Sequence, residues 1–161
     1  MDMPRVSALV LALALAVAPA FGLDPGGPED TLVRYLTALK AQKFEDVYPL
    51  ISTAMKRGKD RDAYVKESKA LMEFADVKIF DFTVGHAKIE NGEAKVPNVL
   101  ESQDRFANTL GLTEYELYTL VREEGAWKVD SQILLEPAEV PKWFPDAARH
   151  APEKPDAGAS H

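Results

Sequence analysis

Two side chains near the middle of the chain could act as proton-transfer bases, Asp81 and His86. Asp81 lies in the segment 76–84, a predicted strand with apolar side chains on both of its faces. If Asp81 points inward, burial raises the pKa of its carboxyl, which could then take up a proton. If Phe80, Phe82 and Val84 face the core instead, Asp81 is left in water. His86 shares its alternation with Lys88, which favours a surface position. The pattern therefore favours exposure of both side chains and a protein without catalytic activity.

Two further groups of charged side chains have a possible binding role. Four cations surround Gly58 just before a predicted helix and could hold an anion there, although a solvated basic loop is the alternative: Lys56, Arg57, Lys59 and Arg61. Four acidic side chains in a later segment are interpreted as keeping a sheet soluble, with weak cation binding as an alternative: Glu114, Glu116, Glu123 and Glu124. The hydroxyls of Tyr35, Tyr115 and Tyr118 could hydrogen-bond a ligand, but Tyr35 and Tyr115 fall at core positions and are interpreted as packing residues.

Composition excludes several classes of protein. The chain has 161 residues, 46% of them hydrophobic, and a net charge of -7, so it can form one domain with a core but lacks the basic face of a nucleic-acid binder. It has no cysteine, which excludes disulfides and thiolate metal sites. No two of its three histidines stand at metal-ligand spacing, so we expect neither a metal nor a cofactor.

The first segment has the pattern of a secretory signal peptide. An uncharged apolar run of 13 residues occupies 6–18 and is shorter than the ~20 residues that span a bilayer. Small residues follow, so cleavage is expected after Ala20 or Gly22. We expect an exported, periplasmic protein that has lost residues 1–22. Contact with a membrane is expected only if this segment stays uncleaved.

After a flexible lead-in at 23–27, three segments have helical periodicity. The first, 28–41, has Pro28 at its start and an apolar stripe at four positions: Leu32, Tyr35, Leu36 and Leu39. The second, 43–52, contains Pro49, which should distort it. The third is expected to begin at a capping Asp60 and to end near residue 74.

From residue 76 the apolar residues alternate with period two, which predicts strands. The segment 76–84 comes first, and the segments 86–90 and 93–100 then flank Asn91-Gly92, a strong hairpin signal. Pro97 lacks an amide hydrogen and is therefore expected at a sheet edge or a bulge.

The segments 112–122 and 126–135 flank Glu123-Glu124-Gly125, for which we expect a three-residue loop. That register pairs Val121 with Trp127 and predicts one core face: Tyr115, Leu117, Val121, Trp127, Val129, Ile133 and Leu135. The chain is thus predicted to be an α+β protein, with three N-terminal helices packed on a curved, mostly antiparallel sheet of four to five strands.

The remaining residues, 136–161, form a proline-rich tail that we expect to be disordered from about residue 147. The other face of the sheet is also partly apolar, which indicates that something covers it. Two covers are open: a second copy of the chain, in a homodimer, or Trp143-Phe144 of the tail.

The order of these elements resembles that of the nuclear transport factor 2-like superfamily, also called the cystatin-like cone fold. The segments that carry the resemblance are DTLVRYLTALKAQKFEDVYPLIS at 30–52 and REEGAWKVDSQ at 122–132, and it covers about residues 28–135. It implies a cone-shaped pocket between helices and sheet, which holds a carboxylate or histidine base in the superfamily's enzymes. Members range from isomerases, cyclases and dehydratases to binding and dimerisation modules, and exported members of unassigned activity are known.

We therefore expect a non-catalytic domain that binds a small apolar molecule or another protein of the cell envelope. The predicted pocket lies between the helical stripe and a sheet face: Leu32, Tyr35, Leu36 and Leu39 on the helix, and Tyr115, Leu117 and Val129 on the sheet. Two alternatives stay open. One is a cofactor-free isomerase, cyclase or dehydratase that uses Asp81 or His86, and the other is a structural dimer in an envelope complex.

Overall fold

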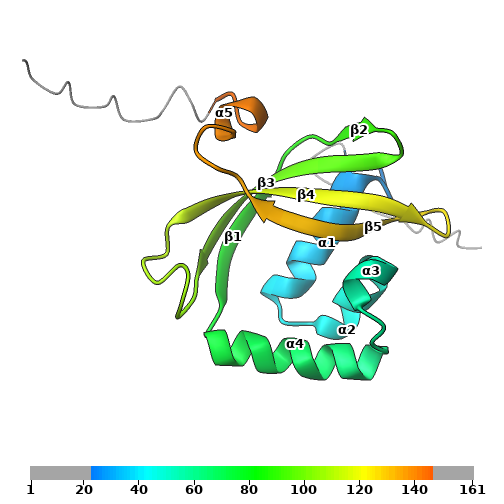
Figure 1. The fold of residues 1–161 in the computed structure, drawn as a ribbon, viewed down its shortest axis with the longest axis vertical. Helices are drawn as coiled ribbons and strands as arrows, with labels where there is room; N and C mark the ends of the chain where they lie inside the picture. Colours follow the sequence, from blue (N-terminus) through cyan, green and yellow to red (C-terminus); the bar gives the residue numbers. More distant parts are fainter. Residues whose placement is uncertain (1–22, 147–161) are drawn as a thin grey trace, which may run out of the picture.

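The computed structural model describes residues 23–146 (Figure 1). The predicted signal peptide, 1–22, and the end of the predicted tail, 147–161, lie outside the described residues. The lead-in forms a turn in which the Gly27 amide donates to the Asp24 carbonyl at 2.8 Å. None of the helices within 23–146 has the length and apolar character needed to cross a membrane.

The helices lie mostly at the N-terminal end. Their bounds are α1 Pro28–Lys40, α2 Phe44–Val47, the 3₁₀ helix η1 Tyr48–Leu50, α3 Thr53–Lys56, α4 Arg61–Ala75 and α5 Val140–Trp143. The helix that runs past Pro49 becomes 3₁₀ there, which is the distortion expected from proline. Asp60 caps α4, because its Oδ1 accepts from the Ala63 amide at 2.9 Å. The predicted count of three helices is wrong, since α3 and α5 are single turns too short to show a period.

One antiparallel sheet faces the N-terminal helices. Its strands are β1 Lys78–Val84, β2 Lys88–Glu90, β3 Glu93–Gln103, β4 Thr113–Glu123 and β5 Ala126–Leu134. Their order is β1-β3-β4-β5, and β2 also pairs with β3. Asn91 and Gly92 both have positive φ, and Ile89 pairs with Ala94, so the first predicted hairpin is confirmed.

Pro97 lies in the inner strand β3, opposite Leu117, and neither at a sheet edge nor at a bulge as expected. It is accommodated because β1 has ended and β2 has not begun beside it. The Pro97 carbonyl accepts from the Gly85 amide at 2.8 Å in this break. A Cβ on Gly85 would stand 2.9 Å from the proline ring, which explains a glycine at this position.

The second hairpin corrects the predicted register. Its loop has two residues, Glu124 and Gly125, both with positive φ, so Trp127 pairs with Arg122 and not with Val121. Tyr118 and Leu120 are therefore buried, whereas four other members of the predicted core face are not: Tyr115, Leu117, Val121 and Ile133. A register shift beyond Leu120 leaves Asp130 without an opposite residue and turns Ile133 away from the helices.

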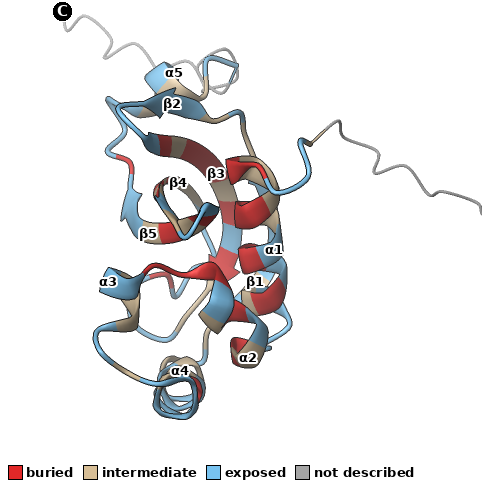
Figure 2. Cartoon of the chain, turned by 90° about the vertical axis from the view of Figure 1, so that its right-hand side faces the viewer, coloured by how far each residue is buried: buried red, intermediate tan, exposed pale blue. Residues whose placement is uncertain are grey.

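The core lies between α1, the turn after α2 and one face of the sheet (Figure 2). We call this face the helix-facing side. It carries Ala94, Val96 and Asn98 of β3 and Glu116, Tyr118 and Leu120 of β4. The opposite side, which carries Pro97, Val99, Tyr115 and Leu117, is called the outer face. The Ser52 amide donates to the Val129 carbonyl at 2.8 Å and joins the helical segment to edge strand β5.

Candidate functional site

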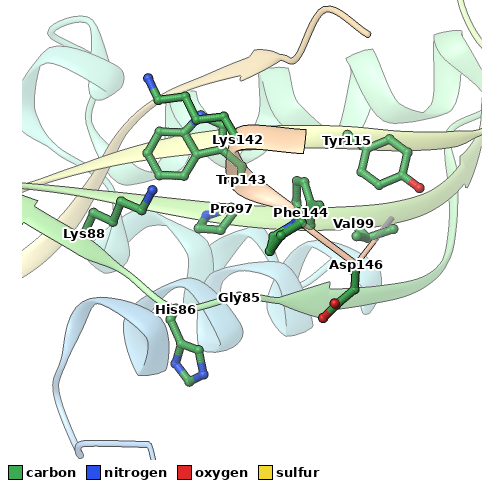
Figure 3. Close-up of a pocket in the computed structure, with 11 residues that line it drawn as sticks. Gly85, His86, Lys88, Pro97, Val99, Tyr115, Lys142, Trp143, Phe144 and Asp146 are labelled. Carbon is green, nitrogen blue, oxygen red and sulfur yellow. The ribbon is translucent and has the colours of Figure 1, made fainter. Parts of the chain in front are cut away.

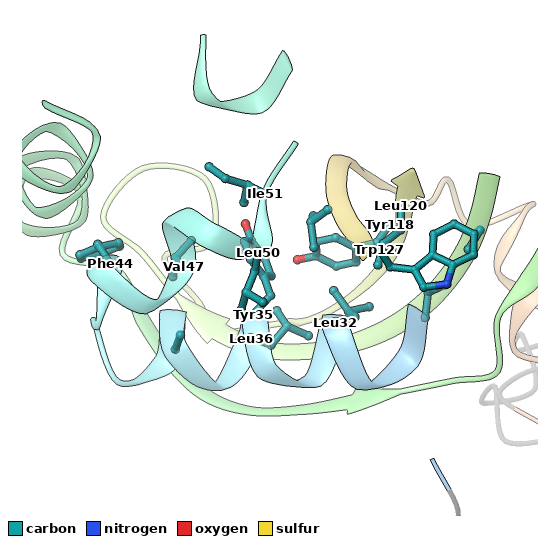
Figure 4. Close-up of a cluster of buried hydrophobic side chains, with 14 of the residues drawn as sticks. Leu32, Tyr35, Leu36, Phe44, Val47, Leu50, Ile51, Tyr118, Leu120 and Trp127 are labelled. Carbon is teal, nitrogen blue, oxygen red and sulfur yellow. The ribbon is translucent and has the colours of Figure 1, made fainter. Parts of the chain in front are cut away.

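The seven residues of the predicted pocket do not line one space. Leu32, Tyr35, Leu36 and Val129 are buried together in the packed core, and Leu39 packs against it (Figure 4). Tyr115 and Leu117 lie on the outer face, because the two-residue loop reverses the predicted alternation of β4. The side chains that meet the helical stripe from β4 are instead Tyr118 and Leu120.

The helix-facing side buries an acidic group that the sequence analysis assigned to the surface. Glu116 of β4 lies opposite Asn98 of β3, and the two residues are 2% and 0% exposed. Asn98 Nδ2 donates to Glu116 Oε2 at 2.8 Å, and Gln132 Nε2 donates to Glu116 Oε1 at 2.6 Å. Tyr118 lies two residues along β4 on the same side of the sheet, beside this carboxylate. We call these four residues, Asn98, Glu116, Tyr118 and Gln132, the Glu116 cluster.

Burial changes the acid–base properties of this cluster. Burial raises the pKa of Glu116, and the hydrogen bonds from Asn98 and Gln132 oppose that rise. Burial also raises the pKa of Tyr118 and of Tyr35, whose rings meet edge to face at 6.1 Å, and the Glu116 charge adds to both effects. A carboxyl that holds a proton more readily than in water thus lies close to two neutral phenols. Such a group can accept a hydrogen bond or exchange a proton.

One polar atom of the Asn98 side chain has no hydrogen-bond partner. Its Oδ1 is the one buried side-chain oxygen or nitrogen within residues 23–146 that has no hydrogen-bond partner. Buried polar atoms are nearly always paired, so an exception of this kind points to a strained or functional position. The free acceptor lies on the same amide that donates to Glu116.

The cluster adjoins an exposed apolar surface. Gln132, which covers Glu116 Oε1, is itself exposed, and Leu134 lies opposite Glu116 and is 56% exposed. Further exposed apolar side chains lie in the loop 104–112 and at the end of α4, where the Phe74 and Phe106 rings meet at 5.3 Å. We call the set the apolar rim: Leu71, Phe74, Phe106, Leu112 and Leu134.

Neither predicted base is buried. The Asp81 side chain is 68% exposed and lies 3.6 Å from the Lys40 ammonium. His86 follows the end of β1 and is also exposed. Within the described residues, no group of three or more histidine or acidic side chains could hold a metal ion.

Three of the four cations of the basic loop contact separate partners. Lys56 lies 4.7 Å from the centroid of the Tyr48 ring, Lys59 pairs with Glu67, and Arg61 donates to the carbonyl of Glu45. Arg57 ends α3 with a φ of 51°. The N-terminus of α4 is already capped by the carboxylate of Asp60, so an anion there would meet a negative charge.

Sequence reasoning missed Glu116, Asn98 and Gln132. The one signal that could have found them is that Glu116 alternates with Tyr118 and Leu120, which marks a carboxyl on an apolar face. The predicted register hides this signal, because it places Tyr118 and Leu120 on the side of the sheet opposite the predicted core face.

Comparisons with known proteins bear on the fold. No protein-family model and no curated protein matches the chain. A SEC-C motif-containing protein of Rhodopseudomonas palustris is similar in structure at 14% identity and a TM-score of 0.52, over 69% of this chain and 80% of that one. An NTF2-like protein of Cytophaga hutchinsonii is similar at 16% identity and a TM-score of 0.48, over 65% and 91%. A putative dehydratase of the NTF2-like family from Streptomyces avermitilis follows at 15% and 0.45, over 63% and 88%.

Sequence identities this low indicate a shared fold and nothing about function. The chain shares its fold with the Rhodopseudomonas protein, and solved structures described as NTF2-like and cystatin-like are among those that it resembles.

Proposed function

We propose that this chain binds a small, largely apolar molecule that carries a hydrogen-bond donor, and that the Glu116 cluster receives the donor. The observation that carries this proposal is the buried, unpaired Oδ1 of Asn98 beside the buried carboxyl of Glu116. An unpaired buried acceptor costs about 1–3 kcal/mol, so a ligand donor at this atom is favoured. The apolar rim supplies a surface for the rest of the molecule, and exposed apolar patches often mark such sites.

Access to the cluster is through Gln132. This side chain is exposed and holds Glu116 by one hydrogen bond from its Nε2. Rotation of an exposed side chain is fast and needs no movement of the sheet. A ligand that arrives across the rim therefore displaces Gln132 from the carboxyl and meets Glu116 first and Asn98 behind it.

Calorimetric titration with 2-naphthol tests this function, because 2-methoxynaphthalene has the same apolar body without the donor. We expect 2-naphthol to bind at least about tenfold more tightly, which corresponds to about 1.4 kcal/mol. Asn98→Leu should remove the difference between the two compounds, while Leu117→Ala on the outer face of the next strand should keep it. Equal affinities in the unchanged protein, or a difference that survives in Asn98→Leu, would contradict the proposal.

The raised pKa of Glu116 favours a second candidate function, proton transfer with Glu116 as the base in place of Asp81 and His86. Ring opening of 5-nitrobenzisoxazole, which a carboxylate base promotes by removing one proton, tests this function. Glu116→Gln should lower the rate about 100-fold or more if the carboxylate is the base. A rate that is equal in the two proteins would leave ligand binding as the function.

We also propose that the protein acts after export, as the apolar run at 6–18 suggests. N-terminal sequencing of protein recovered from the producing cell's envelope should find Phe21 or Leu23 first, and a retained Met1 would contradict export with cleavage. Native mass spectrometry of the same material tests the homodimer and reports any retained molecule as added mass.

A further inference from the structure

The outer face carries a cavity of about 570 Å³ on the side of the sheet away from the Glu116 cluster (Figure 3). It lies where α5 and the residues after it pack over β3 and β4. Its floor is the outer-face pair Pro97 and Val99 with Tyr115, and its roof is Trp143 with Phe144. The Phe144 ring stands edge-on to that of Tyr115 at 5.1 Å. The tail thus covers part of the face that carries Tyr115, which the sequence analysis predicts as the core face. The face that it expects the tail or a second copy to cover, that of Tyr118 and Leu120, is covered by the helices instead.

The rim of this cavity is mainly basic. Lys88 of β2 and Lys142 of α5 place their ammonium groups 4.3 and 5.5 Å from the centroid of the Trp143 ring. His86 and Asp146 line the cavity as well. Each ion pair within residues 23–146 engages other lysines, and neither Lys88 nor Lys142 takes part in one. Two exposed lysines without an ion-pair partner among residues 23–146 thus contact the same aromatic ring at the edge of this cavity.

The two lysines hold their positions by contact with an aromatic ring. At an exposed site a cation–π contact is weak, whereas a charge-assisted hydrogen bond to a carboxylate is among the stronger polar interactions. A carboxylate between the two ammonium groups would therefore gain more than the ring contact supplies. The aromatic walls favour a flat ring, which would meet Trp143 and Tyr115 by stacked or edge-on contacts.

We propose that this cavity binds a small monocarboxylate with a flat aromatic body, its ring between the aromatic walls and its carboxylate between Lys88 and Lys142. The site is separate from the proposed function of the helix-facing side. On the helix-facing side the acidic Glu116 disfavours an anion. On the outer face the two lysines, Lys88 and Lys142, attract one.

Calorimetry with 2-naphthoate on the full chain at neutral pH tests this proposal. The control ligand is 2-naphthamide, which has the same ring and no charge. We expect the carboxylate to bind at least tenfold more tightly than the amide, and the double variant Lys88→Gln, Lys142→Gln to bind both equally. Both lysines are exposed, so these changes should leave the fold intact. Lys95→Gln is the matched control, since Lys95 lies beside Lys88 in the sheet but outside the cavity, and should keep the preference.

Three outcomes overturn the proposal: no binding of 2-naphthoate at millimolar concentration, equal affinity for the amide, or an unchanged preference in the double variant. Asn98→Leu should have no effect on 2-naphthoate. A loss of binding in that variant would place the ligand on the helix-facing side and also overturn the proposal.

Discussion

Replacing Glu116 by glutamine should flatten the dependence of stability on pH above the acid range. Burial raises the pKa of Glu116 in the folded protein, whereas an unfolded chain gives a glutamate an ordinary pKa of about 4.3. Between these two pKa values the folded protein binds the proton more strongly than the unfolded chain does. The stability that this group contributes is therefore full below the unfolded pKa and is lost as the pH rises through the folded pKa.

The size of the effect follows from one proton and two hydrogen bonds. A single proton gives a slope of at most about 1.4 kcal/mol per pH unit. Glutamine keeps one acceptor oxygen for Asn98 Nδ2 or Gln132 Nε2, and the exposed Gln132 can turn to water. We therefore expect the variant to be less stable than the unchanged protein by about 1 kcal/mol near pH 5. That deficit should shrink as the pH rises and the ionised Glu116 becomes costly in the unchanged protein.

Urea unfolding measured from pH 5 to pH 8 in both proteins gives the two curves. Glu101→Gln is the control, because Glu101 is an exposed carboxyl on the outer face of β3. Its curve should run parallel to that of the unchanged protein. Parallel curves for Glu116→Gln as well would mean that Glu116 ionises in the folded protein as it does in water. That result would refute the effect of burial and remove the second candidate function with it.

Two further changes test the scaffold. Gly85→Ala places a Cβ 2.9 Å from the Pro97 ring, so chemical denaturation should show that the free energy of unfolding falls by about 1–3 kcal/mol. His86→Ala, at the next residue, should have little effect. A Gly85→Ala protein of full stability would disprove the contact. Glu123 accepts from the amide and hydroxyl of Thr53, and the backbone hydrogen bond lowers its pKa. Glu123→Gln should therefore lower the urea midpoint at neutral pH, and the difference should vanish as the pH falls through the lowered pKa; a difference that persists in acid would contradict the assignment.

The residue types and spacing within each segment were enough to predict α1 and the first hairpin. Pro28 and the apolar stripe behind it depend on positions three and four apart, and Asn91-Gly92 specifies its own turn. The sheet to which these elements belong follows from the same alternation. These parts of the fold were accordingly predicted from the sequence, to within a few residues at their ends.

The Glu116 cluster depends on register, which local rules do not determine. Glu124 adopts a φ of 52°, an uncommon value for a residue other than glycine, and the loop is one residue shorter than expected. A register that differs by one residue places every β4 side chain on the other face of the sheet. Glu116 therefore lies on the helix-facing side and Tyr115 on the outer face, the reverse of the prediction. The unpaired Asp130 then brought Gln132 to the same side as Glu116. Two irregularities of backbone thus assemble the candidate site, and neither has a strong signal in the residue types.

The proposed binding is tested most directly by the side-chain amide resonances of ¹⁵N-labelled protein during titration with 2-naphthol. Binding at the Glu116 cluster should shift the resonances of Asn98 and Gln132, and the shifts should saturate with the affinity found by calorimetry. 2-Methoxynaphthalene should leave the Asn98 resonance unmoved. Saturable binding of 2-naphthol with both amides unmoved would contradict the proposed binding, because the donor would then be received elsewhere.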